Sequence, residues 1–167
     1  MSPRSIDSRR ARARRTLLLA ALVAGCGAET VQPVAYNHRL HVEKLEIPCV
    51  TCHEGAESGE AAGIPPAAAC ADCHQDPQGK SAEEAKVVAA VRANREIEWV
   101  RLYALPRHVF FTHRRHVQVA GLPCERCHGA MKDATRPPPA ALVALTMDDC
   151  LSCHVGRGAA TDCAACH

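Results

Sequence analysis

Five copies of the short sequence C-x-x-C-H constrain this chain more than any other feature, because they use ten of its 11 cysteines. The copies are Cys49/Cys52/His53, Cys70/Cys73/His74, Cys124/Cys127/His128, Cys150/Cys153/His154 and Cys163/Cys166/His167. Five of the 10 histidines lie outside these motifs, namely His38, His41, His108, His113 and His116. The chain therefore has one free histidine for each motif, and Cys26 is the single cysteine left over.

C-x-x-C-H is the attachment sequence of c-type haem. Two thiols separated by two residues can reach the two vinyl groups on one edge of the macrocycle, and the next imidazole then lies where it can bind iron. A second imidazole on the opposite face would complete six-coordination. We therefore predict five covalently attached haems c, with the motif histidines as proximal ligands and the five free histidines as distal ligands. Because two imidazoles lack the potential-raising thioether of a Met/His pair, we expect low reduction potentials.

Two other uses of the cysteines remain open from spacing alone. A C-x-x-C pair is half of many zinc sites, and ten cysteines could form five disulfides. The histidine that directly follows the second cysteine in all five copies favours haem, because zinc ribbons do not require histidine at that position.

Residues 1–25 have the layout of a bacterial export signal, since six arginines and one aspartate in residues 4–15 precede the apolar run TLLLAALVAG. This run is too short to span a bilayer as a helix, which needs about 20 residues. VAGC at 23–26 resembles a lipobox and predicts a lipid on Cys26; cleavage beside an unmodified cysteine is the alternative. Arg9-Arg10 lacks the apolar consensus of a twin-arginine signal, so we favour the general export route. We expect a periplasm-facing protein anchored to a membrane by lipid, and Gly27 favours the outer membrane.

The predicted mature chain, residues 26–167, is mildly acidic and poor in large apolar side chains. The full chain has 20 Lys+Arg and 18 Asp+Glu, and loss of six bases and one acid with the signal leaves a net charge of −3. No basic patch indicates a nucleic-acid partner. Burial contributes about 25 cal/mol per Å², whereas ordering a residue costs on the order of 1–2 kcal/mol. We therefore expect haem to supply the core and the haem-free chain to be largely disordered. The only aromatic residues are Tyr36, Trp99, Tyr103, Phe110 and Phe111.

An internal repeat relates YNHRLHVEKLEIPCVTCH (36–53) to FTHRRHVQVAGLPCERCH (111–128) at a constant offset of 75 residues. Each copy has two free histidines and is followed by a further haem motif, and the second copy gains one more histidine and one more motif. We predict a signal peptide with lipobox at 1–25, a lipid-anchored tether at 26–35, a two-haem unit at 36–80, a helical connector at 81–98 and a three-haem unit at 99–167.

The expected fold is mostly irregular with short α-helices, one at each motif. Residues 81–96 predict one longer, solvated linker helix that starts with a capping box formed by Ser81 and Glu84. β-Branched and aromatic residues predict a short β-hairpin near 100–111, and the proline run predicts a short helix from Pro139.

HVFFTHRRHVQVAGLPCERCH, followed by two more C-x-x-C-H motifs, resembles the small three-haem cytochromes of the class III cytochrome c superfamily. The longer run from Trp99 through DDCLSCH resembles the pentahaem cytochrome subunit of alternative complex III and related quinone-oxidoreductase cytochromes. The resemblance implies closely packed bis-His haems. It also implies that the first histidine of each pair serves the haem that follows, which joins His113 to His128 and His38 to His53. The second histidine would then serve a neighbouring haem of the same unit.

Full coordination of every iron would leave no position for a substrate, so we expect electron transfer and no catalytic residues. The leading hypothesis is a lipid-anchored pentahaem carrier that relays electrons between redox partner proteins, including a membrane quinol-oxidising complex. The alternative is a fixed electron-transfer subunit of such a complex. A catalytic multihaem reductase is a third hypothesis, and it would need at least one five-coordinate haem.

Overall fold

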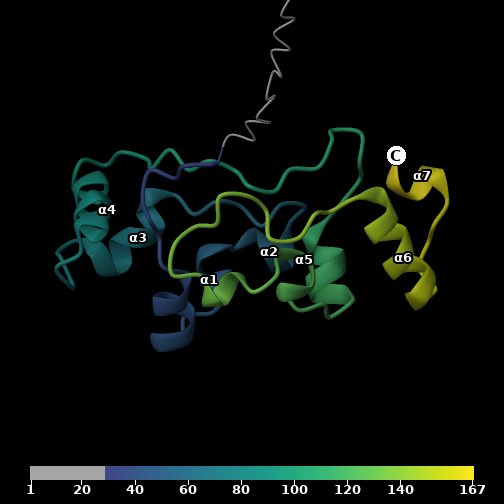
Figure 1. Cartoon of the computed structure of the whole chain (residues 1–167), viewed down its shortest axis with the longest axis horizontal. Helices are drawn as coiled ribbons and strands as arrows, with labels where there is room; N and C mark the ends of the chain where they lie inside the picture. The colour runs from purple at the N-terminus through teal and green to yellow at the C-terminus, as the bar shows by residue number, and fades with distance from the viewer. Residues whose placement is uncertain (1–28) are drawn as a thin grey trace, which may run out of the picture.

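The computed structural model describes residues 29–167, so the predicted signal segment 1–25 and Cys26 lie outside the described residues. Figure 1 shows α3 and α4 at one end of the long axis, α1, α2 and α5 near the middle, and α6 and α7 at the other end. Within residues 29–167 there is no strand. The helical elements are η1 (Arg39–Lys44), α1 (Cys49–Cys52), α2 (Gly55–Ser58), α3 (Ala67–His74), α4 (Ala82–Arg92), η2 (Arg115–Val119), α5 (Glu125–His128), η3 (Met131–Asp133), α6 (Met147–Arg157) and α7 (Cys163–Cys166).

Each C-x-x-C-H motif coincides with a helix, as the sequence predicts. Extended prolines open two of these helices, with Pro48 before α1 and Pro66 before α3. Helix α6 begins with a complete capping box, in which the Thr146 side chain accepts from the Asp149 backbone N–H and Asp149 accepts in return. These local signals hold the two cysteines of each motif on about one helical turn.

The two repeat copies adopt the same local structure. In each copy the first histidine of the pair precedes a π-helix and the second lies within it, η1 in the first copy and η2 in the second. A residue with positive φ follows shortly after the end of each π-helix. That residue is Glu46 (φ 56°) in the first copy and Gly121 (φ 62°) in the second. After it, the N–H of Ile47 donates to His41 O at 3.0 Å, and the N–H of Leu122 donates to His116 O at the same distance. The repeat read from the sequence is therefore also a structural repeat.

The copies exchange contacts reciprocally. Arg39 N–H donates to Ala134 O at 3.0 Å, and Arg114 N–H donates to Gly59 O at 3.0 Å. The two donors, Arg39 and Arg114, are 75 residues apart, and so are the two acceptors, Gly59 and Ala134. The two bonds are therefore related by the offset of the repeat. Such i-to-j and j-to-i contacts are the signature of an isologous, two-fold interface. Each histidine-bearing segment thus docks on the loop that follows the other copy's first motif.

Very little of the described chain is buried. Its buried apolar residues are Val34, Ala56, Ala67, Val87, Val88 and Ala90, and three of these belong to α4. The alanines bury little area, so the polypeptide alone lacks an ordinary core for its length. None of the helices in residues 29–167 has both the length and the apolar character needed to cross a bilayer.

Helix α4 corrects one expectation and refines another. It is not a solvated linker, because Val87, Val88 and Ala90 are buried and the helix packs on α3. Ser81 caps it as predicted, accepting from the backbone N–H of Glu83. Glu84 does not complete a capping box; its carboxylate turns instead to the chain segment before the helix.

The predicted β-hairpin near 100–111 is absent from the described chain, and its backbone groups have other partners. Val100 exchanges two hydrogen bonds with the Gln32 side chain, and Phe110 N–H donates to Cys166 O at 2.8 Å. Pro106 also removes a backbone donor from the middle of the segment. The predicted helix at Pro139 does not form either, and residues 137–146 are irregular.

Candidate haem-binding sites

The structure brings the free histidines and the motif histidines together in opposing pairs. Each pair joins one histidine of each set, and none of the paired histidines is used twice. Ring centroids are 6.3 Å apart for His41 and His74, 6.2 Å for His113 and His128, 6.2 Å for His116 and His154, and 5.3 Å for His108 and His167.

These separations fit two imidazoles on opposite faces of one iron. Metal–nitrogen bonds of about 2.0–2.1 Å on each side, extended by half an imidazole ring, place opposing centroids about 6 Å apart. The planes of His113 and His128 are within 4° of each other, whereas those of His41 and His74 are inclined by 55°. The residues present therefore fit a haem iron between each pair.

His38 is the remaining free histidine, and His53 is one of the two histidines near it. Burial, followed by the nearby His53 and His41, lowers the pKa of His38 to about 4. The imidazole is therefore neutral at physiological pH, which is the form that binds metals. His38 Nδ1 is buried and has no hydrogen-bond partner within the described part of the chain. The pairing of His38 with His53 remains a prediction of the class III resemblance.

Hydrogen bonds at Nδ1 orient most of these rings, and they leave the other nitrogen of each ring free for a metal. Five rings bond a backbone carbonyl oxygen at 2.6–2.9 Å, and only the sixth, His74, bonds a carboxylate, that of Glu84. The five carbonyl-bonded rings are His41 to Asn37, His53 to Gly63, His113 to Glu60, His116 to Thr112 and His154 to Ala160.

One aromatic side chain supports each histidine pair of the repeat. Tyr36 stacks on His41 with centroids 4.6 Å apart and meets His38 edge-on at 4.8 Å. At the equivalent position, Phe111 stacks on His116 at 4.5 Å and meets His113 edge-on at 4.9 Å. The aromatic residue that opens the repeat therefore fixes the angle between its two imidazoles.

Cysteine thiols of successive sites lie near one another. Burial raises the pKa of Cys124, and the nearby Cys49 raises it further. Burial likewise raises the pKa of Cys70, with Cys52 as the next cause, and that of Cys150, with Asp149 and then Cys166 as further causes. These contacts link the first motif to the second and third, and the fourth to the fifth.

The polypeptide by itself covers the motif cysteines to different extents. Seven of the ten are half-buried, but Cys73, Cys150 and Cys163 are exposed. Each exposed thiol shares a helix with the half-buried thiol of the same motif, as Cys73 does with Cys70 on α3. The chain has few large side chains, and in these three motifs the polypeptide covers one thiol without covering the other.

Cys73 is nevertheless part of the same cluster of thiols. Burial raises the pKa of Cys52, and the neighbouring Cys49 and then Cys73 raise it further. The exposed thiol of the second motif therefore lies near the first motif. It remains, with Cys70, the predicted attachment pair for the haem of His74.

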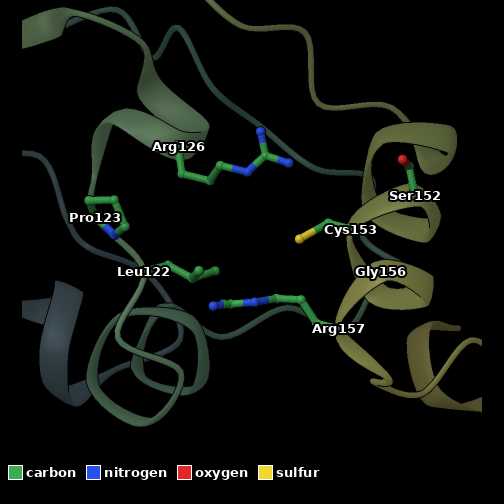
Figure 2. Close-up of a pocket in the computed structure, with 7 residues that line it drawn as sticks. All are labelled: Leu122, Pro123, Arg126, Ser152, Cys153, Gly156 and Arg157. Atoms are coloured by element: carbon green, nitrogen blue, oxygen red, sulfur yellow. The ribbon is translucent and has the colours of Figure 1, made fainter.

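The third and fourth motifs are linked across a cavity. Burial raises the pKa of the Cys127 thiol against the opposing effect of Arg126, and Cys153 raises it further. Figure 2 shows Cys153 Sγ directed into a cavity of about 410 Å³ between α5 and α6. Arg126 and Arg157 extend into the same space from opposite sides. Guanidinium groups are suited to carboxylates such as haem propionates, and the sequence alone had indicated no role for these two arginines.

The alternative uses of the cysteines gain no support from this geometry. All ten motif cysteines are unpaired among residues 29–167, so none of the five possible disulfides forms there. In the same residues, no group of three or more His, Cys, Asp or Glu side chains is arranged to hold a metal ion. Tetrahedral zinc sites need such a group.

Two protein-family models match the chain. The class III cytochrome C family matches residues 20–101, and the family of cytochrome c7 and related cytochrome c matches residues 109–167. The chain has multihaem cytochrome domains of the class III and cytochrome c7 types, and these families imply covalently bound c-type haems. Its helix-rich, strand-free described fold is consistent with small class III cytochromes.

One relative extends the comparison to a respiratory complex. The chain is 37% identical, over 119 residues, to the protein named menaquinone reductase, multiheme cytochrome c subunit, of Nitratidesulfovibrio vulgaris. The match covers 66% of this chain and 55% of the relative, so the chain spans about half of the relative's length.

Proposed function

We propose that the chain is a pentahaem electron-transfer protein whose five irons each have two histidine ligands. The observation that carries the proposal is the set of imidazole pairs, each made of one free and one motif histidine. The proximal ligands would be the five motif histidines, and the distal ligands opposite them, in motif order, would be His38, His41, His113, His116 and His108. The haem, when bound, supplies an iron that takes up and releases one electron at a time.

Paired imidazoles support electron transfer over catalysis. Two nitrogen ligands leave no position on the iron for a substrate, and the five carbonyl bonds at Nδ1 hold the rings in place during oxidation and reduction. The chain would thus conduct electrons without making or breaking bonds.

The thiol contacts support a linear order of sites. Cys49 lies near Cys124, which supports a meeting of the first and third motifs in the middle of the path. The second motif lies at the α3–α4 end, and the fifth lies on α7 at the other end (Figure 1). We infer a path through the sites of His74, His53, His128, His154 and His167, in that order.

A membrane quinone oxidoreductase is the proposed partner. The relative named as a subunit of menaquinone reductase favours a fixed electron-transfer subunit over a free carrier. We propose that the chain works on the periplasmic side, held by a lipid on Cys26, with the two-haem and three-haem units predicted from the sequence. Co-purification with integral membrane subunits from detergent-solubilised membranes tests this role, and isolation as a monomer from the same membranes would contradict it.

Haem count and coordination can be measured on the exported protein. Its mass should exceed that of the polypeptide by five haems and one lipid modification, and its ferric spectrum should show only low-spin signals. Fewer than five haems, or a high-spin ferric signal in the native protein, would overturn the bis-His proposal. The second outcome would favour a catalytic reductase, which needs an open iron.

A further inference from the structure

Glu84 makes one of the candidate sites different from the others. His74 Nδ1 lies 3.2 Å from Glu84 Oε1, whereas the other five bonded imidazoles have neutral backbone carbonyl partners. Among the described residues, this is the single contact between a candidate ligand histidine and a carboxylate that lies within hydrogen-bond distance. The site that it marks is the second motif, at the end of the proposed path.

The carboxylate is held in position by the turn that joins α3 to α4. Gln78 N–H donates to Glu84 Oε1 at 2.6 Å, and Gly79 N–H donates to Oε2 at 2.9 Å. A Cβ atom at position 79 would stand 3.1 Å from Oε2, so glycine permits this close approach. The Glu84 side chain is 11% exposed, which shields its contact with His74 from water.

The turn is also tied to α4 from its other side, because Arg92 Nε donates to Gln75 O at 2.9 Å and Arg92 forms an ion pair with Asp76. The contact therefore belongs to a packed unit of α3, the turn and α4.

We propose that Glu84 is a positioning residue that lowers the reduction potential of the haem held by His74. A carboxylate that accepts the Nδ1 proton makes the imidazole a more basic ligand, and second-shell hydrogen bonds of this kind are one way in which proteins set haem potentials. The more basic ligand and the adjacent negative charge both favour the ferric state. Uptake of one electron converts ferric to ferrous iron, breaks no bond and leaves the proton on His74. This inference rests on the proposed ligation by His74.

Glu84→Gln tests the proposal, with Glu83→Gln as a matched control. Glutamine keeps the size of Glu84 and an oxygen that can accept from the turn, but it removes the charge. Glu83 is one residue away and loses the same charge, yet it bonds Lys86 and the backbone N–H of Ala35 instead of a histidine. Both variants are compared with the parent protein by spectroelectrochemical titration and by electron paramagnetic resonance of the ferric form.

In Glu84→Gln, we expect one-fifth of the haem absorbance change to move to higher potential and one low-spin ferric signal to shift, with both unchanged in Glu83→Gln. No shift in Glu84→Gln, or equal shifts in both variants, would overturn the role of Glu84 if each protein carries five haems by mass. A parent protein with fewer than five haems would instead contradict the proposed function, and the inference with it. The mass measurement therefore separates the two failures.

Discussion

His113 and His128 face each other with ring centroids 6.2 Å apart and planes within 4°. His113 precedes η2, and His128 follows the loop that ends at Pro123. The two rings nevertheless lie opposite each other, as two ligands of one iron would. His113 is oriented by Glu60 of the other repeat copy, which accepts from both its backbone N–H and its ring. The alignment of this pair therefore depends on the docking of one copy on the other.

Removal of a distal imidazole should open one iron. We expect His113→Ala to bind one equivalent of carbon monoxide in the reduced state, because the iron at His128 loses its sixth ligand. The parent protein should bind almost none. Arg114→Ala serves as the control, since Arg114 contacts the first copy through its backbone N–H, which alanine retains. Equal carbon monoxide binding by parent and His113→Ala proteins would be incompatible with bis-His ligation.

Substitution of the positive-φ residue after each π-helix should change the free energy of unfolding in opposite directions in the two copies. A Cβ at Gly121 would meet nothing within 4 Å, so Gly121→Ala tests backbone conformation alone. We expect this change to lower the free energy of unfolding by about 1 kcal/mol, because a left-handed conformation disfavours residues with a Cβ. Glu46→Gly should instead be neutral or stabilising. Denaturation of the haem-loaded proteins measures both, and a stabilising Gly121→Ala would contradict the explanation.

The packing of α4 on α3 should be visible in stability. Val88 is 4% exposed, and we expect Val88→Ala to cost about 2 kcal/mol of unfolding free energy through lost burial and an incompletely closed cavity. Val31→Ala removes the same atoms from a side chain that is 81% exposed, so it should change stability by less than about 0.5 kcal/mol. Equal effects of the two substitutions would restore the solvated-linker interpretation.

Loss of the haems should unfold the chain. We expect the mature polypeptide, produced where haem is not attached, to lack most helical circular dichroism. Six small or medium apolar residues form the whole buried set of the described chain, and they cannot offset the conformational entropy of so many residues. A haem-free polypeptide with the helical signal of the loaded protein would show that the chain carries its own core.

The two arginines of the cavity should raise haem reduction potentials, whereas Glu84 is proposed to lower one. Arg126 and Arg157 extend from opposite sides into the cavity into which Cys153 also points (Figure 2). A nearby cation favours the ferrous state, so Arg126→Gln and Arg157→Gln should each lower the potential of at least one haem. Arg95→Gln, outside the cavity lining, is the control. The titration used for Glu84 detects this change, and an upward shift in either variant would contradict it.

The motif helices and the repeat were predictable because their signals are local. Two cysteines and a histidine within five residues, or a proline directly before them, determine a short helix without help from distant parts of the chain. The pairing of distal with proximal histidines is a different kind of information. His108 and His167 are brought together only by the whole path of the C-terminal segment, so counting showed that partners exist without showing which they are.

Glu84 illustrates how a local pattern can point to the wrong partner. Serine followed three residues later by glutamate is the sequence of a capping box, and Ser81 does cap the helix. The carboxylate had two stronger donors available in the turn before the helix, Gln78 and Gly79, and a nearby imidazole. Similarly, residues 100–111 have strand-forming side chains, but a strand needs a neighbour, and Gln32 and Cys166 already satisfied the backbone groups of Val100 and Phe110.

The paired bonds of Arg39 with Ala134 and of Arg114 with Gly59 have a consequence for how the molecule comes apart. The histidine-bearing segment of each repeat copy packs on the loop of the other copy, as in a domain-swapped dimer whose two subunits are joined in one chain. A protease cut in the irregular stretch between 94 and 98 would therefore yield two fragments that remain clasped under native conditions. Neither fragment, produced separately, would enclose the haem of its own first motif, which is that of His53 in one fragment and that of His128 in the other.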